Sequence, residues 1–402
     1  MDLIDIIPIW VTVISLTLGI VGMTILLRFH VIRSMADPNI VALFQITFTF
    51  FILLFLGDLL IVDLVGFLLF VGMLLRFRSS GKAGPPFISQ NDWVSFCKVF
   101  SIVLLVLNVY LVSQKGFLLL APDVASERVQ FYEGWGIFRR FNEVGVGLTA
   151  ITAAVLWHDE RRKQAIAIAV FSAYLALTLG SRSGLLACLL AYGAYLHFAR
   201  TRVSNKRLLF AGLGLGLSSL LIFFVMFGAG FLGAFAYRVL SFSDGPVYYF
   251  HDHMYKYSDY SPTYPFDDLL TDLRLQQNYD NPPSNRPVPL GRFINFHHFG
   301  EDTPLLGPNP QIFVESHAAF RWLSILWYIM AAGLFILLRK GSTPFSFFLG
   351  CYIAGPLLID SQFAGSQVFT ITILLLLVGA FTLARFVLRN ARPGDCRNFS
   401  KA

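Results

Sequence analysis

The hydrophobic positions of this chain are grouped in long runs, and short polar segments separate each run from the next. A helix needs about 20 mostly apolar residues to cross the hydrocarbon core of a bilayer. Eleven runs approach that length, so the pattern predicts eleven membrane-spanning helices. They lie at residues 7–27, 39–56, 59–75, 95–112, 143–157, 164–180, 183–199, 208–229, 318–337, 344–360 and 367–388.

Basic residues follow the predicted helices in a regular way. If the N-terminus faces outward, 20 of the 31 Lys and Arg residues fall in cytoplasmic segments. Short cytoplasmic loops of membrane proteins are rich in Lys and Arg, so the pattern predicts an outer N-terminus and an inner C-terminus. Asp2 and Asp5 precede the first run, without a basic segment or a cleavage site. We therefore expect a retained helix there rather than a signal peptide.

The amino-acid composition agrees with the pattern of long apolar runs. Apolar residues make up 56% of the chain and charged residues 14%, whereas soluble domains carry about 25% charged residues. These values exclude a soluble domain, a disordered chain and a nucleic-acid-binding protein. The four cysteines show neither a disulfide framework nor a metal-binding spacing. The expected fold class is an all-α polytopic integral membrane protein.

Three regions follow from this topology: residues 1–229, with eight helices and an outer loop at 113–142; a large outer loop at 230–317; and residues 318–402, with three helices and a cytoplasmic tail. The large loop holds five of the eight histidines, and its ten acidic residues outnumber its five basic ones. A loop of that length without secondary structure would be unusual. We expect it to be partly helical, with one short amphipathic helix from Asp267 to Leu275.

Several arginines lie on the outer side, against the general trend. Arg182 stands in the short turn between two apolar runs, and Arg139 and Arg140 directly precede the fifth. A guanidinium at the membrane boundary is costly unless it is paired or reaches water, and it can bind phosphate oxygens bidentately. These residues indicate either an anion site or anchoring to phospholipid headgroups. The large loop adds Arg238, Arg274, Arg286 and Arg292.

Other polar residues give weaker signals. His251-Asp252-His253 matches no common zinc spacing, so no metal is predicted. Asp58 is expected to be a solvated turn residue. Asp63 lies about one turn into the membrane, where it is expected to pair with a basic group or take part in a proton relay.

Two segments resemble a known family. Pro308-Asn309-Pro310, followed by Phe313, Glu315 and Phe320, resembles a stretch of the Wzy family, the bacterial polymerases that build O-antigen and capsule from lipid-linked oligosaccharides. The segment from Thr178 to Gly184 is similar to an arginine motif shared by these polymerases and the O-antigen ligases. Arg321 stands where the family more usually has glycine. The resemblance implies a GT-C-like architecture with its active site facing the periplasm, in the bacterial inner membrane.

The resemblance also implies a reaction. The growing glycan would move from undecaprenyl diphosphate to a hydroxyl of an incoming lipid-linked unit, without a metal or nucleotide cofactor. Departure of the diphosphate needs nearby positive charge, and the acceptor hydroxyl needs a base. Glu315 and His298 are the first candidates for the base, followed by His317 and His297. The candidate substrate-binding residues are Arg182, Arg139, Arg140, Arg292, Arg238, Arg274, Asn309 and Tyr249. The implied partners are the lipid-linked donor and acceptor, membrane lipids and a chain-length regulator of the Wzz type.

Other interpretations stay open. An O-antigen ligase would use the same donor with lipid A core as the acceptor. A transporter or flippase would show inverted repeats, and none is evident in the sequence. Glu315 could instead interact with a helix N-terminus or a loop arginine, and the histidine pair at 297 and 298 could simply be exposed. The loop tyrosines suit either sugar stacking or the membrane interface.

Overall fold

The structure is a computed structural model, and its described residues are helical. No β-strand occurs among them, so the predicted all-α class is confirmed for that part of the chain. The structure describes residues 3–32, 37–77, 86, 88–116, 131, 135–178, 182–198, 233, 237, 239–256, 258, 260–273, 289–300 and 308–390.

Ten of the eleven predicted runs form helices, and the eighth, at 208–229, lies outside the described residues. The ten runs correspond to α2 (Ile9–Arg28), α3 (Ile40–Leu56), α4 (Ile61–Arg76), α5 (Gln90–Lys115), α7 (Gly136–His158), α8 (Arg162–Thr178), α9 (Arg182–Phe198), α16 (Ser324–Leu338), α17 (Pro344–Ile359) and α18 (Ser361–Asn390).

Four described stretches are long and apolar enough to cross a membrane: Ile9–Arg28, Gln90–Lys115, Gln311–Leu338 and Ser361–Leu388. Large apolar side chains on these helices face outward; Ile9 is 80% exposed and Leu376 is 68% exposed. Exposed apolar surface on this scale marks a face that contacts other molecules, and here hydrocarbon tails would cover it. The chain is therefore a helical membrane protein, while the count of eleven spans and the orientation stay predictions.

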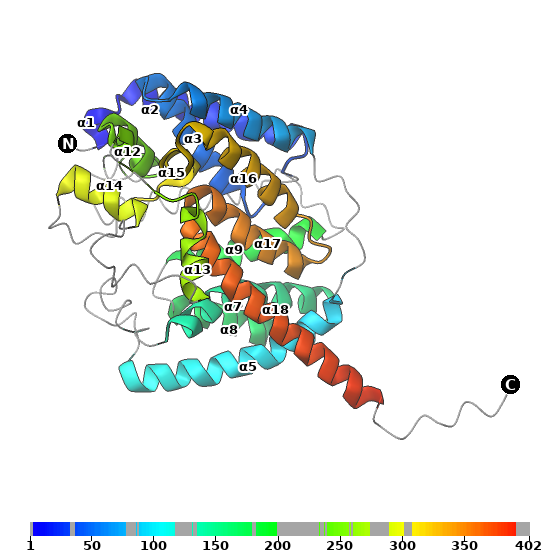
Figure 1. Cartoon of the computed structure of the whole chain (residues 1–402). Coiled ribbons are helices and arrows are strands. Elements are labelled where there is room, and N and C mark those ends of the chain that lie inside the picture. Colours follow the sequence, from blue (N-terminus) through cyan, green and yellow to red (C-terminus); the bar gives the residue numbers. More distant parts are fainter. Residues whose placement is uncertain are drawn as a thin grey trace. The chain divides into compact units, whose positions relative to one another are not determined.

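The chain divides into two compact units. The first contains residues 1–82, 199–340 and 350–368, and the second contains residues 83–198, 341–349 and 369–402. In the first unit α2 packs on α3, and α4 packs on α16 (Figure 1). The α4–α16 contact is close at Gly66, where an added Cβ would lie 2.3 Å from the Tyr328 ring. Small residues permit such close helix packing in membranes.

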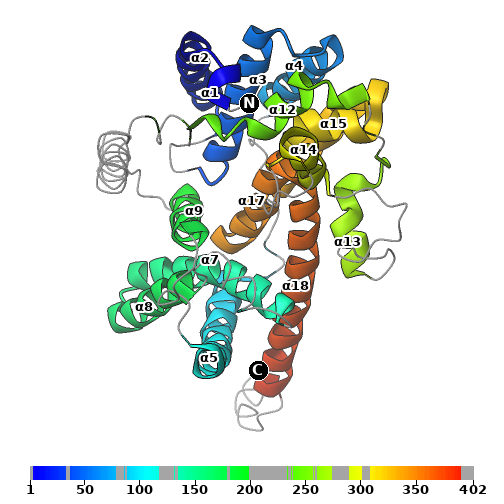
Figure 2. The same ribbon diagram turned by 90° about the vertical axis from the view of Figure 1, so that its left-hand side faces the viewer.

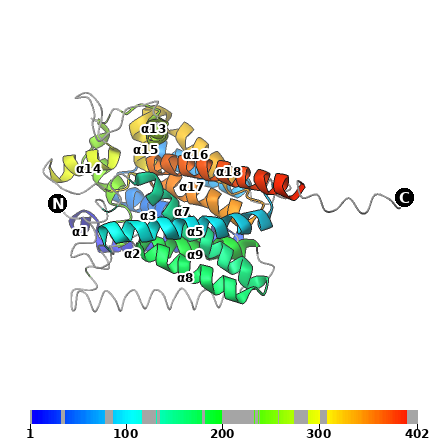
Figure 3. The ribbon, with the colours of Figure 1, turned by 90° about the horizontal axis from the view of Figure 1, so that it is seen from below.

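In the second unit α7 is the central helix. It packs against α5, α8 and α9 (Figures 2 and 3). Gly147 faces the ring of Phe348, and a Cβ there would lie 2.0 Å from that ring. The amides of Asn108 on α5 and Asn142 on α7 are both buried, and they exchange hydrogen bonds of 2.9 and 3.1 Å.

The large loop is partly helical, as predicted. Its described part forms α12 (Asp244–His251), η3 (Met254–Lys256), η4 (Tyr264–Phe266), α13 (Asp267–Asp272), α14 (Leu290–Phe299) and α15 (Gln311–Phe320). The short helix expected from Asp267 is present and ends at Asp272 rather than Leu275.

The ninth predicted run differs from expectation. Instead of one helix from 318 to 337, the chain forms α15, a 3-10 turn η5 (Arg321–Leu323) and α16. Arg321 has φ 50 and ψ −122, which lies far from helical values and ends α15. Hydropathy could not show this break, because the residues on both sides are apolar.

Candidate functional site

Helix α15 carries three buried polar side chains, those of Gln311, Glu315 and Ser316, and its backbone is unusual at both ends. Gln311, its first residue, has φ 55, and Arg321 follows its last residue with φ 50. The Gln311 amide nitrogen donates a hydrogen bond to the Phe242 carbonyl. The carbonyl of Asn309 lies against α12, where a Cβ added to Gly245 would be only 2.2 Å away. The Pro-Asn-Pro segment thus leads into a helix, as expected, and holds it against α12.

Glu315 lies fully buried in the middle of α15. Its Oε1 accepts a hydrogen bond of 2.6 Å from the backbone N–H of Ser361, the first residue of α18. The first N–H groups of a helix lack partners within it, so a carboxylate there is stabilised by the donors and by the helix dipole. Oε2 has no hydrogen-bond partner among the described residues. Glu315 therefore interacts with a helix N-terminus, and that helix is α18 rather than its own.

Asp63 is the second buried carboxylate of this region. Its Oδ1 accepts hydrogen bonds of 3.3 Å from the hydroxyls of Ser316 and Tyr328. Because Ser316 lies on α15 and Tyr328 on α16, Asp63 on α4 bridges the two helices across their break. Among the described residues the hydrogen-bond donors to Asp63 are these two hydroxyls, and a basic partner stays a prediction.

His317 is half-buried beside aromatic rings. Its Nδ1 lies 3.5 Å from the hydroxyl of Tyr249, and that hydroxyl lies 2.5 Å from Oγ of Ser258. The rings of Tyr249, Phe250 and Tyr255 stand edge-on to the imidazole, with centroid distances of 6.3, 6.3 and 5.6 Å. Burial raises the pKa of Tyr249, so its phenol stays protonated at neutral pH. The structure thus brings together two of the predicted site residues, His317 and Tyr249.

His298 has a different environment. Its Nδ1 lies 2.5 Å from Oδ2 of Asp252, and its ring stacks on Tyr248 at a centroid distance of 3.8 Å. Tyr248 and Tyr249 are consecutive on α12, and consecutive helical residues point about 100° apart. His298 and His317 therefore contact α12 from different directions. His297 is exposed, and Arg292 is exposed with its guanidinium 5.0 Å from the Phe296 ring.

The remaining predicted arginines are only partly described. In the second unit, Arg139 forms an ion pair of 3.1 Å with Glu143, and Arg140 is half-buried. Arg182 is the first residue of helix α9; its side chain and the preceding residues 179–181 lie outside the described part of the chain. Arg238 and Arg274, together with Arg286, lie outside the described residues. A role for any of these arginines in binding diphosphate stays a prediction.

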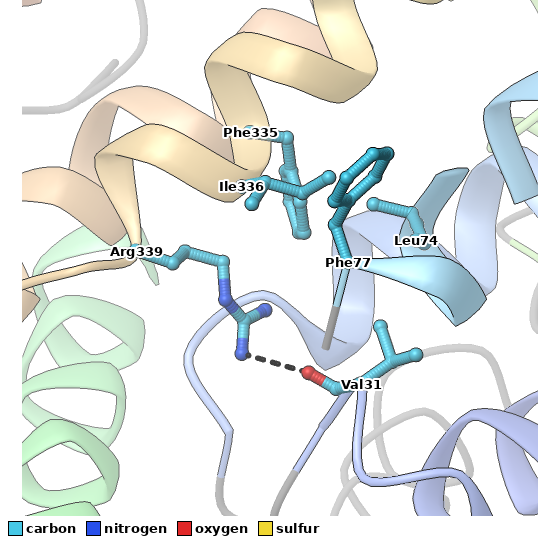
Figure 4. A pocket seen from close by; sticks show the side chains of 6 residues that line it. All are labelled: Val31, Leu74, Phe77, Phe335, Ile336 and Arg339. Carbon is cyan, nitrogen blue, oxygen red and sulfur yellow. Dashed lines mark hydrogen bonds between the residues drawn. The ribbon is translucent and has the colours of Figure 1, made fainter. Parts of the chain in front are cut away.

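Two features of the first unit lie apart from α15. Arg339 and Asp37 form a buried ion pair of 2.5 Å, and Arg339 also donates to the Val31 carbonyl at 3.4 Å. Figure 4 shows a small pocket at this place, lined mainly by apolar side chains. The lining residues are Val31, Leu74, Phe77, Phe335, Ile336 and Arg339.

Asp58 is half-buried rather than solvated, which corrects the expectation for this turn. Its Oδ2 lies 3.8 Å from Nδ1 of His251. Burial raises the pKa of Asp58, and attraction by His251 and His253 opposes that effect. No group of three or more His, Cys, Asp or Glu side chains in the described residues could hold a metal ion.

The sequence indicated His298, Tyr249 and Glu315 as site residues, but it did not indicate the residues that they contact. Asp252 was considered only as a metal ligand, and Ser258 and Ser361 gave no signal. Arg321 did give one, because it replaces a glycine of the resembled family. Comparisons with protein-family models, with curated proteins and with solved structures find no match to this chain.

Proposed function

We propose that this chain is a membrane glycosyltransferase of the Wzy type, which polymerises undecaprenyl-diphosphate-linked repeat units at the periplasmic face of a bacterial inner membrane. The observation that carries the proposal is the pairing of Tyr249 on α12 with His317, which lies in the segment that resembles the polymerases. Polar side chains beside a helix break suit chemistry at a membrane boundary, because irregular backbone at membrane depth is tolerated only against protein or a water-filled cavity.

In the proposed reaction, the oxygen of the acceptor hydroxyl attacks the anomeric carbon of the donor glycan. A new C–O bond forms, the bond from that carbon to the diphosphate oxygen breaks, and the electron pair leaves with the lipid diphosphate. His317 takes the hydroxyl proton at Nε2, in the tautomer whose Nδ1–H faces the Tyr249 hydroxyl. A positioned base of this kind contributes about 10²- to 10⁴-fold to the rate.

His317 serves as the base in this proposal for a geometric reason. Glu315 is fully buried and one of its oxygens is engaged by Ser361, whereas His317 is partly accessible. His298 already has Asp252 at hydrogen-bond distance from Nδ1. The half-buried ring of Tyr255 beside His317 suits the apolar face of a sugar. The expectation that Arg139, Arg140 and Arg182 bind the diphosphate stays a prediction from the sequence, and the assignment of His317 does not depend on it.

Deletion of the gene followed by glycolipid analysis tests the function. Loss of a polymerase leaves single repeats attached to the lipid A core, and its reintroduction restores a ladder of chain lengths. Polymer stranded on undecaprenyl diphosphate would instead identify a ligase, and the absence of repeat units outside the membrane would identify a flippase. Either of these results would contradict the proposal.

His317→Ala tests the assigned base. We expect the variant to insert normally and to leave single repeats, because the acceptor hydroxyl then lacks its base. His158→Ala is the matched control, since His158 is an exposed histidine at the end of α7. That control should retain the full ladder of chain lengths. A full ladder in His317→Ala would remove His317 from the site.

A further inference from the structure

Arg321 has a backbone conformation that suits glycine. At φ 50 and ψ −122, the Cβ of an L-residue crowds its own backbone, whereas glycine adopts this region readily. An arginine in this conformation carries a steric cost relative to glycine, which the surrounding structure has to offset. Strained residues of this kind are concentrated at functional sites.

The surroundings of Arg321 indicate what its side chain contributes. Arg321 and the next residue, Trp322, are both exposed, and Trp322 is 77% exposed. They occupy the turn between α15 and the apolar helix α16, and the topology predicted from sequence, with a span at 318–337, places this turn near the outer membrane–water interface, where tryptophan is common. His317 lies four residues, about one helical turn, before Arg321 at the end of α15. A cation is thus held beside the proposed base.

We propose that Arg321 and Trp322 bind a phosphate group carried by a lipid and, resting on the proposed function, that this group is the diphosphate of the undecaprenyl-linked substrate. The guanidinium matches phosphate oxygens bidentately, and the indole packs against the lipid chain. A phospholipid headgroup offers the same chemistry. The substrate is favoured because Arg321 lies about one helical turn from His317, so a diphosphate held there would lie near the proposed base.

Arg321→Gly separates binding from stability, because glycine relieves the strain while it removes the cation. In purified full-length protein in neutral detergent, we expect this variant to melt at the same temperature as the wild type or higher. Its dissociation constant for undecaprenyl diphosphate should rise about 10-fold or more, as for loss of a charge-assisted hydrogen bond. Arg321→Lys keeps the charge without the bidentate geometry and should fall between the two. Glu160→Gly is the matched control, since Glu160 is exposed with φ 60; it should gain stability without a change in affinity.

The results that would overturn the inference are distinct. Unchanged binding of undecaprenyl diphosphate by Arg321→Gly would remove Arg321 from the site, and a lower melting temperature would show that the arginine stabilises the turn. Phosphatidylglycerol in mixed micelles is the second probe. If Arg321→Gly weakens binding of phosphatidylglycerol as much as that of undecaprenyl diphosphate, the residue anchors headgroups and the substrate assignment is wrong.

These measurements need no transferase activity, so they are independent of the deletion experiment. A deletion without a polymer phenotype would sink the proposed function and leave an Arg321-dependent diphosphate site standing. His317→Ala should bind undecaprenyl diphosphate as the wild type does, because the proposed base is not a phosphate ligand. Weakened binding in that variant would overturn the separation of the two roles.

Discussion

The close contact between α4 and α16 predicts the effect of adding a single methyl group. In Gly66→Ala the new Cβ would lie 2.3, 2.7 and 2.9 Å from three ring atoms of Tyr328. Tyr328 is fully buried, so its ring cannot move aside without displacing its neighbours. Overpacking of this kind costs about 1–3 kcal/mol, and distances this short place the cost near the upper end. Alanine returns about 1 kcal/mol through helix propensity, so we expect a net loss of about 2 kcal/mol.

Gly72 on the same helix provides the matched control. No atom lies within 4 Å of a Cβ added there, so Gly72→Ala should be neutral or gain up to about 1 kcal/mol. The two variants should therefore differ by about 3 kcal/mol in unfolding free energy, measured by denaturant titration in detergent micelles. In a Tyr328→Leu background, Gly66→Ala should cost clearly less. Equal stability of Gly66→Ala and Gly72→Ala would refute the packing argument.

Two further predictions concern carboxylates. Glu315→Ala leaves the buried N–H of Ser361 without its acceptor and should cost about 1–3 kcal/mol, whereas Glu315→Gln keeps an acceptor and most of the stability in the same titration; equal losses would show that the charge matters more than the hydrogen bond. Burial raises the pKa of Asp58, so the stability due to its protonated form is present below about pH 4 and is lost as the pH rises through the raised pKa. Asp58→Asn should therefore raise the melting temperature relative to the wild type more at pH 8 than at pH 4, and the reverse order would contradict the role of burial.

The helices of this chain can be predicted from sequence because apolar runs of about 20 residues have few alternatives. The break at Arg321 cannot be predicted this way, since it depends on one φ angle inside a continuous apolar pattern. The substitution of arginine for the expected glycine marked the position without revealing its geometry. The boundary before α9 is easier to predict, because the polar residues Ser181, Arg182 and Ser183 interrupt the apolar pattern there.

The candidate site was predicted residue by residue but not as an arrangement. The motif points to Glu315, and the large loop contains Tyr249. The residues that contact the two buried acids, Glu315 and Asp63, nevertheless lie far from them in the sequence. Asp63 lies 253 residues before Ser316, and Ser361 lies 46 residues after Glu315. Only the folded packing of α4, α15 and α18 shows that the two acids join helices. It also shows that His317, ranked third from sequence, is the more accessible base.

The two buried asparagines of the second unit have a consequence for where its arginines lie. Apolar faces of two helices can pack in several registers, because the contacts between apolar side chains have similar energies in each register. A slide of one turn, about 5.4 Å, would break both hydrogen bonds between the buried amides of Asn108 and Asn142, at the cost of separating buried polar groups. The pair of asparagines therefore fixes the packing register of α7 along α5. Arg139 and Arg140 precede Asn142 by three and two residues, within one helical turn, so an uncharged amide pair sets the position of these two cations along α5.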